Sequence, residues 1–491
     1  MDFILSFWPF DTDDTVTLLV VIARCVFAVA FVMNIVPLLI WGERKGASYI
    51  QDRPGPNRAP LPLPHPMDLP RIPGRFFAGT TPLFKPWIEI RAAGLVHTLN
   101  DVVKLITKED IIPGHVEGFY WALAPVVAMT IALTTFIVVP FGDTFLGYDL
   151  QVSTIDGGLL FVLALTSLGV YGVMLAGWSS NNKFSLLGGL RSSAQMVSYE
   201  LAMGLSAVVI FLNAGSVSLT EIARQQSLPL DLYFFQIPAL NWNIFSIFGF
   251  IAFILFWVSA FAETNRTPFD LPEGEAELVA GYHTEYSSLR FALFFMAEYA
   301  NMIVASAVTA TLFFGGYNVP FLDGETLRDH ADWVLVAAGG AVPLFLTFAA
   351  IAWRRRDRPF YKAIPVDDPR QREPAFWALA VWPGAAAVHA GIAFAGLMGV
   401  ASTLSMNVLT FGFIENATIF GPDLVALIAQ ITALAVKVLI GCWIFIWVRW
   451  TVPRFRYDQL MNLGWRYMLP VALVNVFAVA TWIIVKHQLL A

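Results

Sequence analysis

The stretch FAETNRTPFDLPEGEAELVAGYHTEY, residues Phe261–Tyr286, decides how this chain is organised. It sets a single arginine, Arg266, among six carboxylates: Glu263, Asp270, Glu273, Glu275, Glu277 and Glu285. A long apolar run precedes the stretch and another follows it. Because apolar runs of that length are typical of membrane spans, the carboxylates are predicted to lie beside a membrane.

The composition is that of a polytopic membrane protein. Of the 491 residues, 57% are hydrophobic and 13% are charged, whereas soluble domains have roughly 25% charged residues. The mean hydropathy is +0.66. The first residues lack a basic segment followed by a small-residue cleavage site, so we expect no removable signal peptide and a first span that serves as the anchor.

Ten apolar segments are long enough, or nearly so, to cross a hydrocarbon core of about 30 Å. They are residues 16–41, 118–140, 158–178, 193–213, 244–262, 290–314, 333–353, 375–400, 423–448 and 467–486. The sequence therefore predicts an all-α polytopic membrane protein with about ten transmembrane helices.

The basic residues predict the orientation of these spans. If the amino terminus lies outside, the inner segments hold 25 of the 30 Lys and Arg residues, as the positive-inside rule requires. Those segments are residues 42–117, 179–192, 263–290, 354–374 and 449–466. The acidic stretch is thus predicted on the cytoplasmic side.

The segment between the first two spans has two parts. Residues 60–90 are rich in proline, which excludes a regular helix and predicts an extended arm. Residues 92–106 place Leu95, Leu99 and Ile106 at helical spacing, opposite polar residues. This pattern predicts an amphipathic helix on the cytoplasmic face of the membrane.

Two carboxylates are predicted at matching depth inside the membrane. Glu298 follows Arg290 by eight residues and Glu200 follows Arg191 by nine, which corresponds to about 12 and about 13 Å along a helix. Carboxylates in lipid are costly unless they face water, a partner or a proton. We therefore expect a polar cavity within the bundle, and a structural hydrogen bond between helices is the alternative.

Other polar residues in the spans have simpler interpretations. Lys437 lies about 18 Å from the end of its span, and it requires either a cavity or carboxylate partner or a purely structural pairing. His389 is more typical of an interior histidine than of a proton carrier. Cys25 and Cys442 stand alone in apolar runs and are expected to be packing residues, so no iron–sulfur or zinc site is predicted.

The spacing within the acidic stretch permits two interpretations. Glu273 and Glu277 would share one helical face, with Glu275 on another, and like charges so placed raise each other's pKa. Such groups suit proton exchange, although a solvated acidic loop is equally consistent with the spacing. Pro268 and Pro272 break any continuous helix and predict a shaped turn. No nucleotide-binding or hydrolase motif is present, so redox carriers are expected on other chains.

Several long motifs are shared with one family. They are Glu43-Arg-Lys, Asp52-Arg-Pro-Gly-Pro-Asn57, Lys104–Pro113, Asn182–Arg191, Gln195–Glu200, Phe261–Tyr286, Ala297–Met302 and Pro453–Met461. In this order, through most of the chain, they resemble the H subunit of bacterial NADH:quinone oxidoreductase, respiratory complex I.

The resemblance implies a subunit at the mouth of a quinone chamber, where a hydrophilic axis toward proton-pumping subunits begins. It implies proton-coupling roles for Glu200, Glu263, Glu273, Glu275, Glu277, Glu285 and Glu298. It implies quinone contacts for Arg44, Arg53, Arg266 and Asp270.

The resemblance also implies the setting of the chain. Quinone would be the substrate, this chain would bind no cofactor, and FMN and iron–sulfur clusters would lie on partner subunits. The expected partners are the quinone-site subunits of the peripheral arm and antiporter-like membrane subunits in the bacterial inner membrane, with no nucleic acid.

Two departures from the family pattern shape the predicted organisation. Residues 60–90 are additional, and residues 320–422 add two spans and a basic loop to the usual eight spans. We therefore predict six spans in residues 1–319, an inserted pair in 320–422 and two family-like spans in 423–491. Two alternatives stay open: an anchor subunit of a hydrogenase or a ferredoxin- or F420-linked complex, and a stand-alone proton-coupled transporter.

Overall fold

The computed structural model describes residues 12–53, 55–56, 61–63, 88–90, 94–145, 148–232, 235–237, 240–271, 274–338, 355, 391–392, 405–407 and 418–490. The chain folds as two compact units. The first unit comprises Met1–Val36, Lys108–Ala331 and Ala401–Ala491, and the second comprises Pro37–Thr107 and Asp332–Val400.

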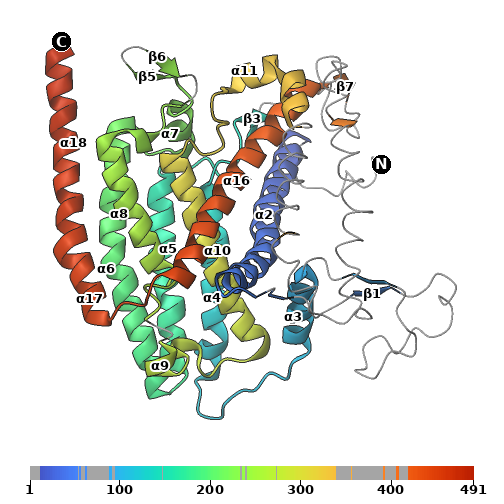
Figure 1. Cartoon of the computed structure of the whole chain (residues 1–491), viewed down its shortest axis with the longest axis vertical. Coiled ribbons are helices and arrows are strands. Elements are labelled where there is room, and N and C mark those ends of the chain that lie inside the picture. Colours follow the sequence, from blue (N-terminus) through green and yellow to red (C-terminus); the bar gives the residue numbers. More distant parts are fainter. Residues whose placement is uncertain are drawn as a thin grey trace. The chain divides into compact units, whose positions relative to one another are not determined.

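The first unit is a helical bundle (Figure 1). Its long helices are α4 (Gly118–Thr135), α5 (Gly158–Ser179), α6 (Lys183–Ala214), α8 (Ile247–Glu263), α10 (Ser288–Phe313), α16 (Gly421–Thr451) and α18 (Leu469–Leu490). Successive helices α4, α5 and α6 pack side by side, α8 packs on α6, and α18 packs on α6 and α8.

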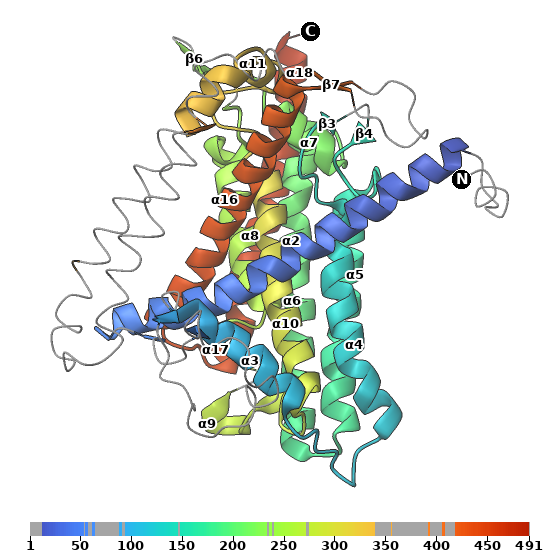
Figure 2. The ribbon, with the colours of Figure 1, turned by 90° about the vertical axis from the view of Figure 1, so that its right-hand side faces the viewer.

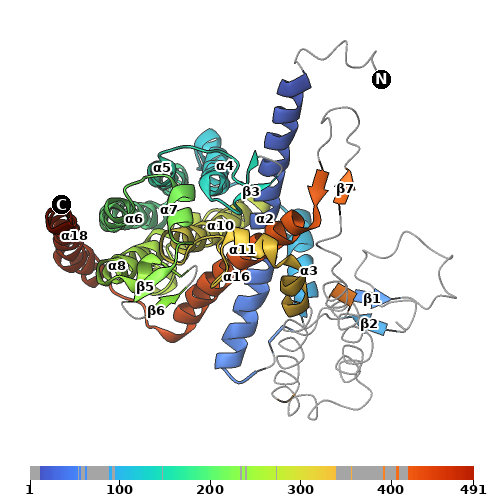
Figure 3. The same cartoon turned by 90° about the horizontal axis from the view of Figure 1, so that it is seen from above.

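Helix α10 lies in the middle of this bundle. It packs against α4, α8 and α16, and the view from above places it among the surrounding helices (Figure 3). From Met302 to Leu312 most of its residues are buried, including three hydroxyl side chains. Because a central helix has no face toward lipid, α10 can carry polar groups that a peripheral span would not tolerate.

Short elements gather at the two ends of the bundle (Figure 2). One end, called the α9 end here, carries α9 (Glu275–Leu278) and the 3-10 turn η5 (Gly281–His283). The other end, the α7 end, carries α7 (Leu219–Gln225) and α11 (Gly324–Asp329). The remaining elements are η3 (Phe136–Val138), η4 (Asn243–Phe245), α17 (Tyr457–Asn462), the π-helix η8 (Leu463–Met468) and the antiparallel hairpins β3–β4 (Thr144–Phe145, Tyr148–Asp149), β5–β6 (Leu230–Leu232, Phe235–Ile237) and β7–β8 (Ser405–Asn407, Thr418–Phe420).

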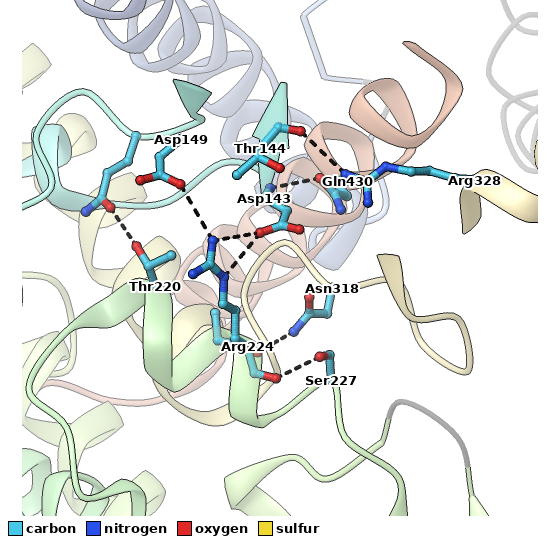
Figure 4. Close-up of polar contacts among 11 residues, drawn as sticks. Asp143, Thr144, Asp149, Thr220, Arg224, Ser227, Asn318, Arg328 and Gln430 are labelled. Atoms are coloured by element: carbon cyan, nitrogen blue, oxygen red, sulfur yellow. Dashed lines mark hydrogen bonds and ion pairs between the residues drawn. The ribbon is translucent and has the colours of Figure 1, made fainter. Parts of the chain in front are cut away.

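Polar side chains hold the α7 end together (Figure 4). The Arg224 guanidinium lies 3.0 Å from Asp143 Oδ1, and the amide N–H of Asp143 donates to Gln430 Oε1 at 3.0 Å. Arg328 pairs with Asp423 at 3.0 Å. These contacts fix the first half of α16 on the segments that follow α4, α6 and α10.

Eight of the ten predicted spans correspond to observed helices. Seven helices of the described residues are long and apolar enough to cross a membrane, and α8 is a shorter apolar helix of 17 residues. The predicted pair 333–353 and 375–400 falls almost wholly outside the described residues, as does His389. The division into 1–319, 320–422 and 423–491 therefore stays a prediction.

Most of the predicted inner segment 179–192 is helical, because α6 already begins at Lys183, and its side of the membrane stays a prediction. Asn182 supplies the helix cap by accepting a hydrogen bond from the Phe184 amide at 3.0 Å. Gly188 lies within α6 and leaves room for the backbone of Gly281 and Tyr282, which approaches the helix closely at this point. The helix ends at Gly215, whose φ of +64° is typical of a helix C-terminus.

The second unit contains the predicted amphipathic helix as α3 (Leu95–Thr107). Helix α2 (Thr12–Ile50) crosses from the first unit into the second and continues beyond the predicted end at Trp41. Its first interruption is Asp52, with a φ of +51°. The ends of the proline-rich arm pair as antiparallel strands β1 (Leu61–Leu63) and β2 (Ile88–Ile90), and residues 64–87 lie outside the described part of the chain.

Candidate functional site

Side chains of α6 fix the turn that follows α8. Gln195 Nε2 donates to the carbonyl of Ala262 at 2.6 Å and to that of Phe269 at 2.9 Å. Asn265 has a φ of +51°, a conformation that asparagine tolerates better than most residues. One glutamine thus closes the turn at both ends and holds Arg266 inside it.

Arg266 forms a buried ion pair with Glu298. Arg266 Nε lies 2.6 Å from Glu298 Oε1, and the two side chains are 2% and 14% exposed. The guanidinium also stacks on Tyr299, 4.2 Å from the ring centroid. The turn after α8 and the middle of α10 therefore meet through opposite charges. The family resemblance implied different roles for the two residues, a quinone contact for Arg266 and proton coupling for Glu298.

A small cavity lies beside this pair. Its volume is about 40 Å³, and its polar lining comes from Glu263, Glu298, Thr166, Asn265 and Asn301. A space of that size with several polar partners can hold a few water molecules. The predicted polar cavity is thus present inside the bundle.

Glu200 completes the group of intramembrane carboxylates. Ser167 Oγ donates a hydrogen bond to Glu200 Oε1, and the charge of Glu200 acts on Glu263. Helices α5, α6, α8 and α10 therefore bring Glu200 and Glu298 each close to Glu263, and their matching depth in the membrane stays a prediction.

The acidic loop continues toward the α9 end. Glu277 pairs with Arg191 at 2.8 Å. Glu285 accepts a hydrogen bond from Asn182 Nδ2 at 2.7 Å and lies 3.9 Å from His115 Nε2. Glu275 is the first residue of α9, without a described side chain, and Glu273 lies outside the described residues.

The loop is seated on α6 by close backbone packing. Ser185 Oγ donates to the carbonyl of Tyr282 at 3.0 Å. Tyr286 stacks on Trp121 with ring centroids 4.9 Å apart, and burial raises the pKa of its hydroxyl. Burial also lowers the pKa of His283 to about 4, so this imidazole is neutral at physiological pH.

Asp270 is held by the segment between α16 and α17. Its Oδ2 lies 2.8 Å from Arg454 Nη2, and its side chain is 5% exposed. The Phe455 amide donates to the carbonyl of Pro268 at 3.1 Å. Asp270 is therefore an ion-pair partner within the chain, and its predicted contact with quinone stays a prediction.

The other two arginines of the predicted quinone set belong to the second unit. Arg44 pairs with Asp101 of α3 at 2.5 Å. Arg53 Nε donates to Gln51 Oε1 at 2.7 Å in the turn after α2. Both side chains have partners within their own unit, and their contact with quinone stays a prediction.

In the described part of the chain, Lys437 pairs with backbone carbonyls. This is the structural pairing that the sequence allowed as the alternative to a carboxylate or cavity partner. Its ammonium donates to the carbonyls of Phe314, Gly316 and Asn318. The last carbonyls of a helix have no partner within the helix, and here the lysine of a neighbouring helix supplies one. Cys442, one turn further along α16, is buried against α10, as expected of a packing residue.

Several residues of this site were not among the sequence-based candidates. They are Thr166, Ser167, Asn182, Arg191 and Arg454. The two adjacent hydroxyls gave a usable signal, since they are the polar pair in an otherwise apolar span. The two arginines gave none, because an arginine at the end of a span is equally typical of a lipid-headgroup contact.

The arrangement brings titratable side chains of α6, α8 and α10 close to one another. Glu263 and Glu298 line one cavity, Glu298 pairs with Arg266, and the charge of Glu200 acts on Glu263. The protonation of one carboxylate therefore changes the electrostatic potential at its neighbour. Among the described residues no group of three His, Cys, Asp or Glu side chains could hold a metal ion.

Comparison with known proteins identifies the family. A sequence model of the NADH dehydrogenase family matches residues 22–362 and 384–480. The chain belongs to this family.

Individual relatives carry the name of one component of the enzyme. The NADH-quinone oxidoreductase subunit 8 of Rhodothermus marinus is 38% identical over 443 residues, covering 90% of this chain and 91% of its own length. The H subunit of NADH-quinone oxidoreductase from Leptospira biflexa is 38% identical over 440 residues, covering 87% and 85%. The H subunit numbered 2 of Koribacter versatilis is 36% identical over 483 residues, covering 96% and 98%. The resemblance in the motifs is thereby confirmed, and the chain is a membrane subunit of NADH:quinone oxidoreductase.

Proposed function

We propose that this membrane subunit forms the entrance of the quinone chamber and the acidic funnel that couples quinone reduction to proton translocation. The observation that carries the proposal is the cavity lined by Glu263 and Glu298, with Arg266 paired to Glu298 and the charge of Glu200 acting on Glu263. Such a group of ionisable side chains within a membrane bundle is a functional site by default, because its cost must be offset by a use.

The acidic loop supplies the approach to this cavity. Glu277 and Glu285 lie on the α9 side, bound to Arg191 and Asn182, and Glu273 and Glu275 stand in the same loop. Quinone reduction on a neighbouring subunit changes the charge in the chamber, and the loop carboxylates pass that change on by shifting protons. The α9 end accordingly faces the cytoplasm and the peripheral arm, and the amino terminus lies on the periplasmic side of the inner membrane.

The Arg266–Glu298 ion pair makes the side-chain arrangement of the funnel depend on protonation. A proton on Glu298 would weaken the ion pair and leave the guanidinium to interact with the other carboxylates of the cavity. Protonation and side-chain position are therefore linked, as coupling requires. The antiporter-like membrane subunits would receive the resulting change.

The Glu263→Gln variant tests the proposal, because it removes the charge beside the cavity while keeping the size of the side chain. We expect proton pumping in inverted membrane vesicles to fall by about a hundredfold, the lower end of the range for a removed proton-transfer group. Glu221→Gln, an exposed carboxylate of α7 at the opposite end, is the matched control. Wild-type pumping in Glu263→Gln vesicles with normal assembly would refute the proposal.

A further inference from the structure

The ammonium of Lys437 sits in a cage of backbone carbonyls. It donates to the carbonyls of Phe314 at 2.8 Å, Gly316 at 2.8 Å and Asn318 at 2.7 Å. The ring of Trp242 lies 4.9 Å from Nζ. An ammonium has three N–H donors, so the three carbonyls use all of them. The carbonyls of Phe314, Gly316 and Asn318 with the Trp242 ring are called the carbonyl cage below.

The cage is built by the turn that ends α10. Gly315 and Gly316 have φ values of +74° and +55°, which only glycine adopts readily. This backbone turns back on itself, so that carbonyls on both sides of the glycines point at one place. The negative end of the helix dipole adds to their attraction for a cation.

Neighbouring side chains hold the last turn of α10 in the same way. Gln226 Nε2 donates to the carbonyl of Thr311 at 2.8 Å, and Asn243 Nδ2 donates to that of Leu312 at 2.8 Å. The Gly315 amide donates to Gln226 Oε1 at 3.0 Å. Of these three described side chains that bind the helix end, Lys437 is the one that carries a charge.

The cage is also tied to the α7 end. Asn318 Nδ2 donates to the carbonyl of Ala223, and Figure 4 shows Asn318 beside Arg224 and Ser227. Arg224 is itself fixed by Asp143. The carbonyls are therefore positioned by contacts that do not involve the lysine, and removal of the ammonium would leave an intact cage with unbonded acceptors.

Lys437 also defines how α16 lies along α10. At Gly441, one turn after Lys437, an added Cβ would lie 2.9 Å from Ser306 Cβ. Cys442 Sγ lies 3.5 Å from Ser306 Oγ. The two helices are thus in close contact beside Ser306, and the three hydrogen bonds of the ammonium further fix their relative position along the helix axes.

We propose that Lys437 is a positioning residue for coupling: a tethered cation in the carbonyl cage that fixes α10 against α16 and thereby sets Glu298 opposite Arg266. Glu298 lies on the same buried helix, about 24 Å along it from the cage. The role assigned to Lys437 in pumping rests on the proposed function of Glu298, whereas the cage itself does not.

Chemical rescue tests this assignment in the assembled enzyme. Lys437→Ala leaves room for methylammonium, a small cation with three N–H donors. We expect Lys437→Ala to lower pumping in inverted vesicles by about tenfold, as the loss of partners for buried carbonyls implies, and methylammonium to restore most of it. Tetramethylammonium, which has no N–H, should restore none. Lys486→Ala, an exposed lysine near the end of α18, is the control that neither cation should affect.

A second readout separates the cage from the pumping role. Methylammonium should raise the thermal unfolding midpoint of the purified Lys437→Ala enzyme and leave that of the wild type unchanged. Lys437→Gln, which keeps two N–H donors without the charge, should assemble and show an intermediate midpoint.

Three results would overturn the assignment. Wild-type pumping in Lys437→Ala vesicles would exclude a positioning role, and absence of thermal rescue would exclude the cage. Thermal rescue without recovery of pumping would leave the lysine a structural cap alone. Wild-type pumping in Glu298→Gln vesicles would instead refute the proposed function, and the thermal experiment would remain informative about the cage.

Discussion

Replacing Arg266 with glutamine should destabilise the protein by about 3–5 kcal/mol, the usual cost of removing one partner of a buried ion pair. The magnitude follows from the burial of both groups, since Arg266 is 2% exposed and Glu298 is 14% exposed. In Arg266→Gln, Glu298 either keeps a charge without its guanidinium or takes up a proton. Both outcomes remove the response on which the proposed coupling depends.

The double variant Arg266→Gln/Glu298→Gln separates stability from coupling. With both charges gone, no ion is stranded in the bundle, so the loss of stability should shrink to about 1–2 kcal/mol. Proton pumping should remain impaired in the double variant, because the titratable group is absent. The assays are the thermal unfolding midpoint of the purified enzyme and pumping per NADH oxidised in inverted vesicles.

The control is Arg456→Gln. Arg456 pairs with Asp458 at 3.2 Å, but the two side chains are 74% and 69% exposed, and exposed pairs contribute about 0–1 kcal/mol. The reasoning would be refuted if Arg266→Gln were as stable as Arg456→Gln, or if the double variant were no more stable than the single one.

Two further predictions concern the loop at the α9 end. Gly188→Ala should cost about 1–3 kcal/mol, because the new Cβ would lie 2.8 Å from Gly281 Cα and from the Tyr282 amide nitrogen; an unchanged unfolding midpoint would contradict the packing. Stability should fall as the pH drops below 6.5 and level off near pH 4, because burial lowers the pKa of His283 to about 4 and only the unfolded state binds the proton between these values. The full loss is about 3 kcal/mol, and it should disappear in His283→Gln when midpoints are measured across this range.

The membrane architecture followed from the sequence because hydropathy is local. A run such as 158–178 must be a helix in lipid, since its backbone has no water to bind. The predicted boundaries were less accurate where no residue stops a helix, as in the continuation of α2 to Ile50 and the early start of α6 at Lys183.

The carboxylates of the candidate site also followed from the sequence, because charged residues are unusual beside and within apolar spans. Similar spacings from flanking arginines, nine and eight residues, predicted a similar depth for Glu200 and Glu298, and the bundle brings both near Glu263. Depth along a helix depends only on rise per residue. The motifs that indicated the family could likewise be recognised from the sequence alone, because they are runs of consecutive residues.

Only the tertiary structure decided which charge meets which. Arg266 and Glu298 are separated by α9, η5 and the start of α10, and their contact depends on how α10 rotates and where the turn after α8 closes. The partners of Lys437 are backbone carbonyls, and no sequence pattern marks an acceptor that every residue possesses. The sequence by itself determined the eight apolar helices that the structure describes, the acidic stretch and its family, because each depends on residues near one another in the chain. The pairing of Arg266 with Glu298 depends on long-range packing, and only the fold decided it.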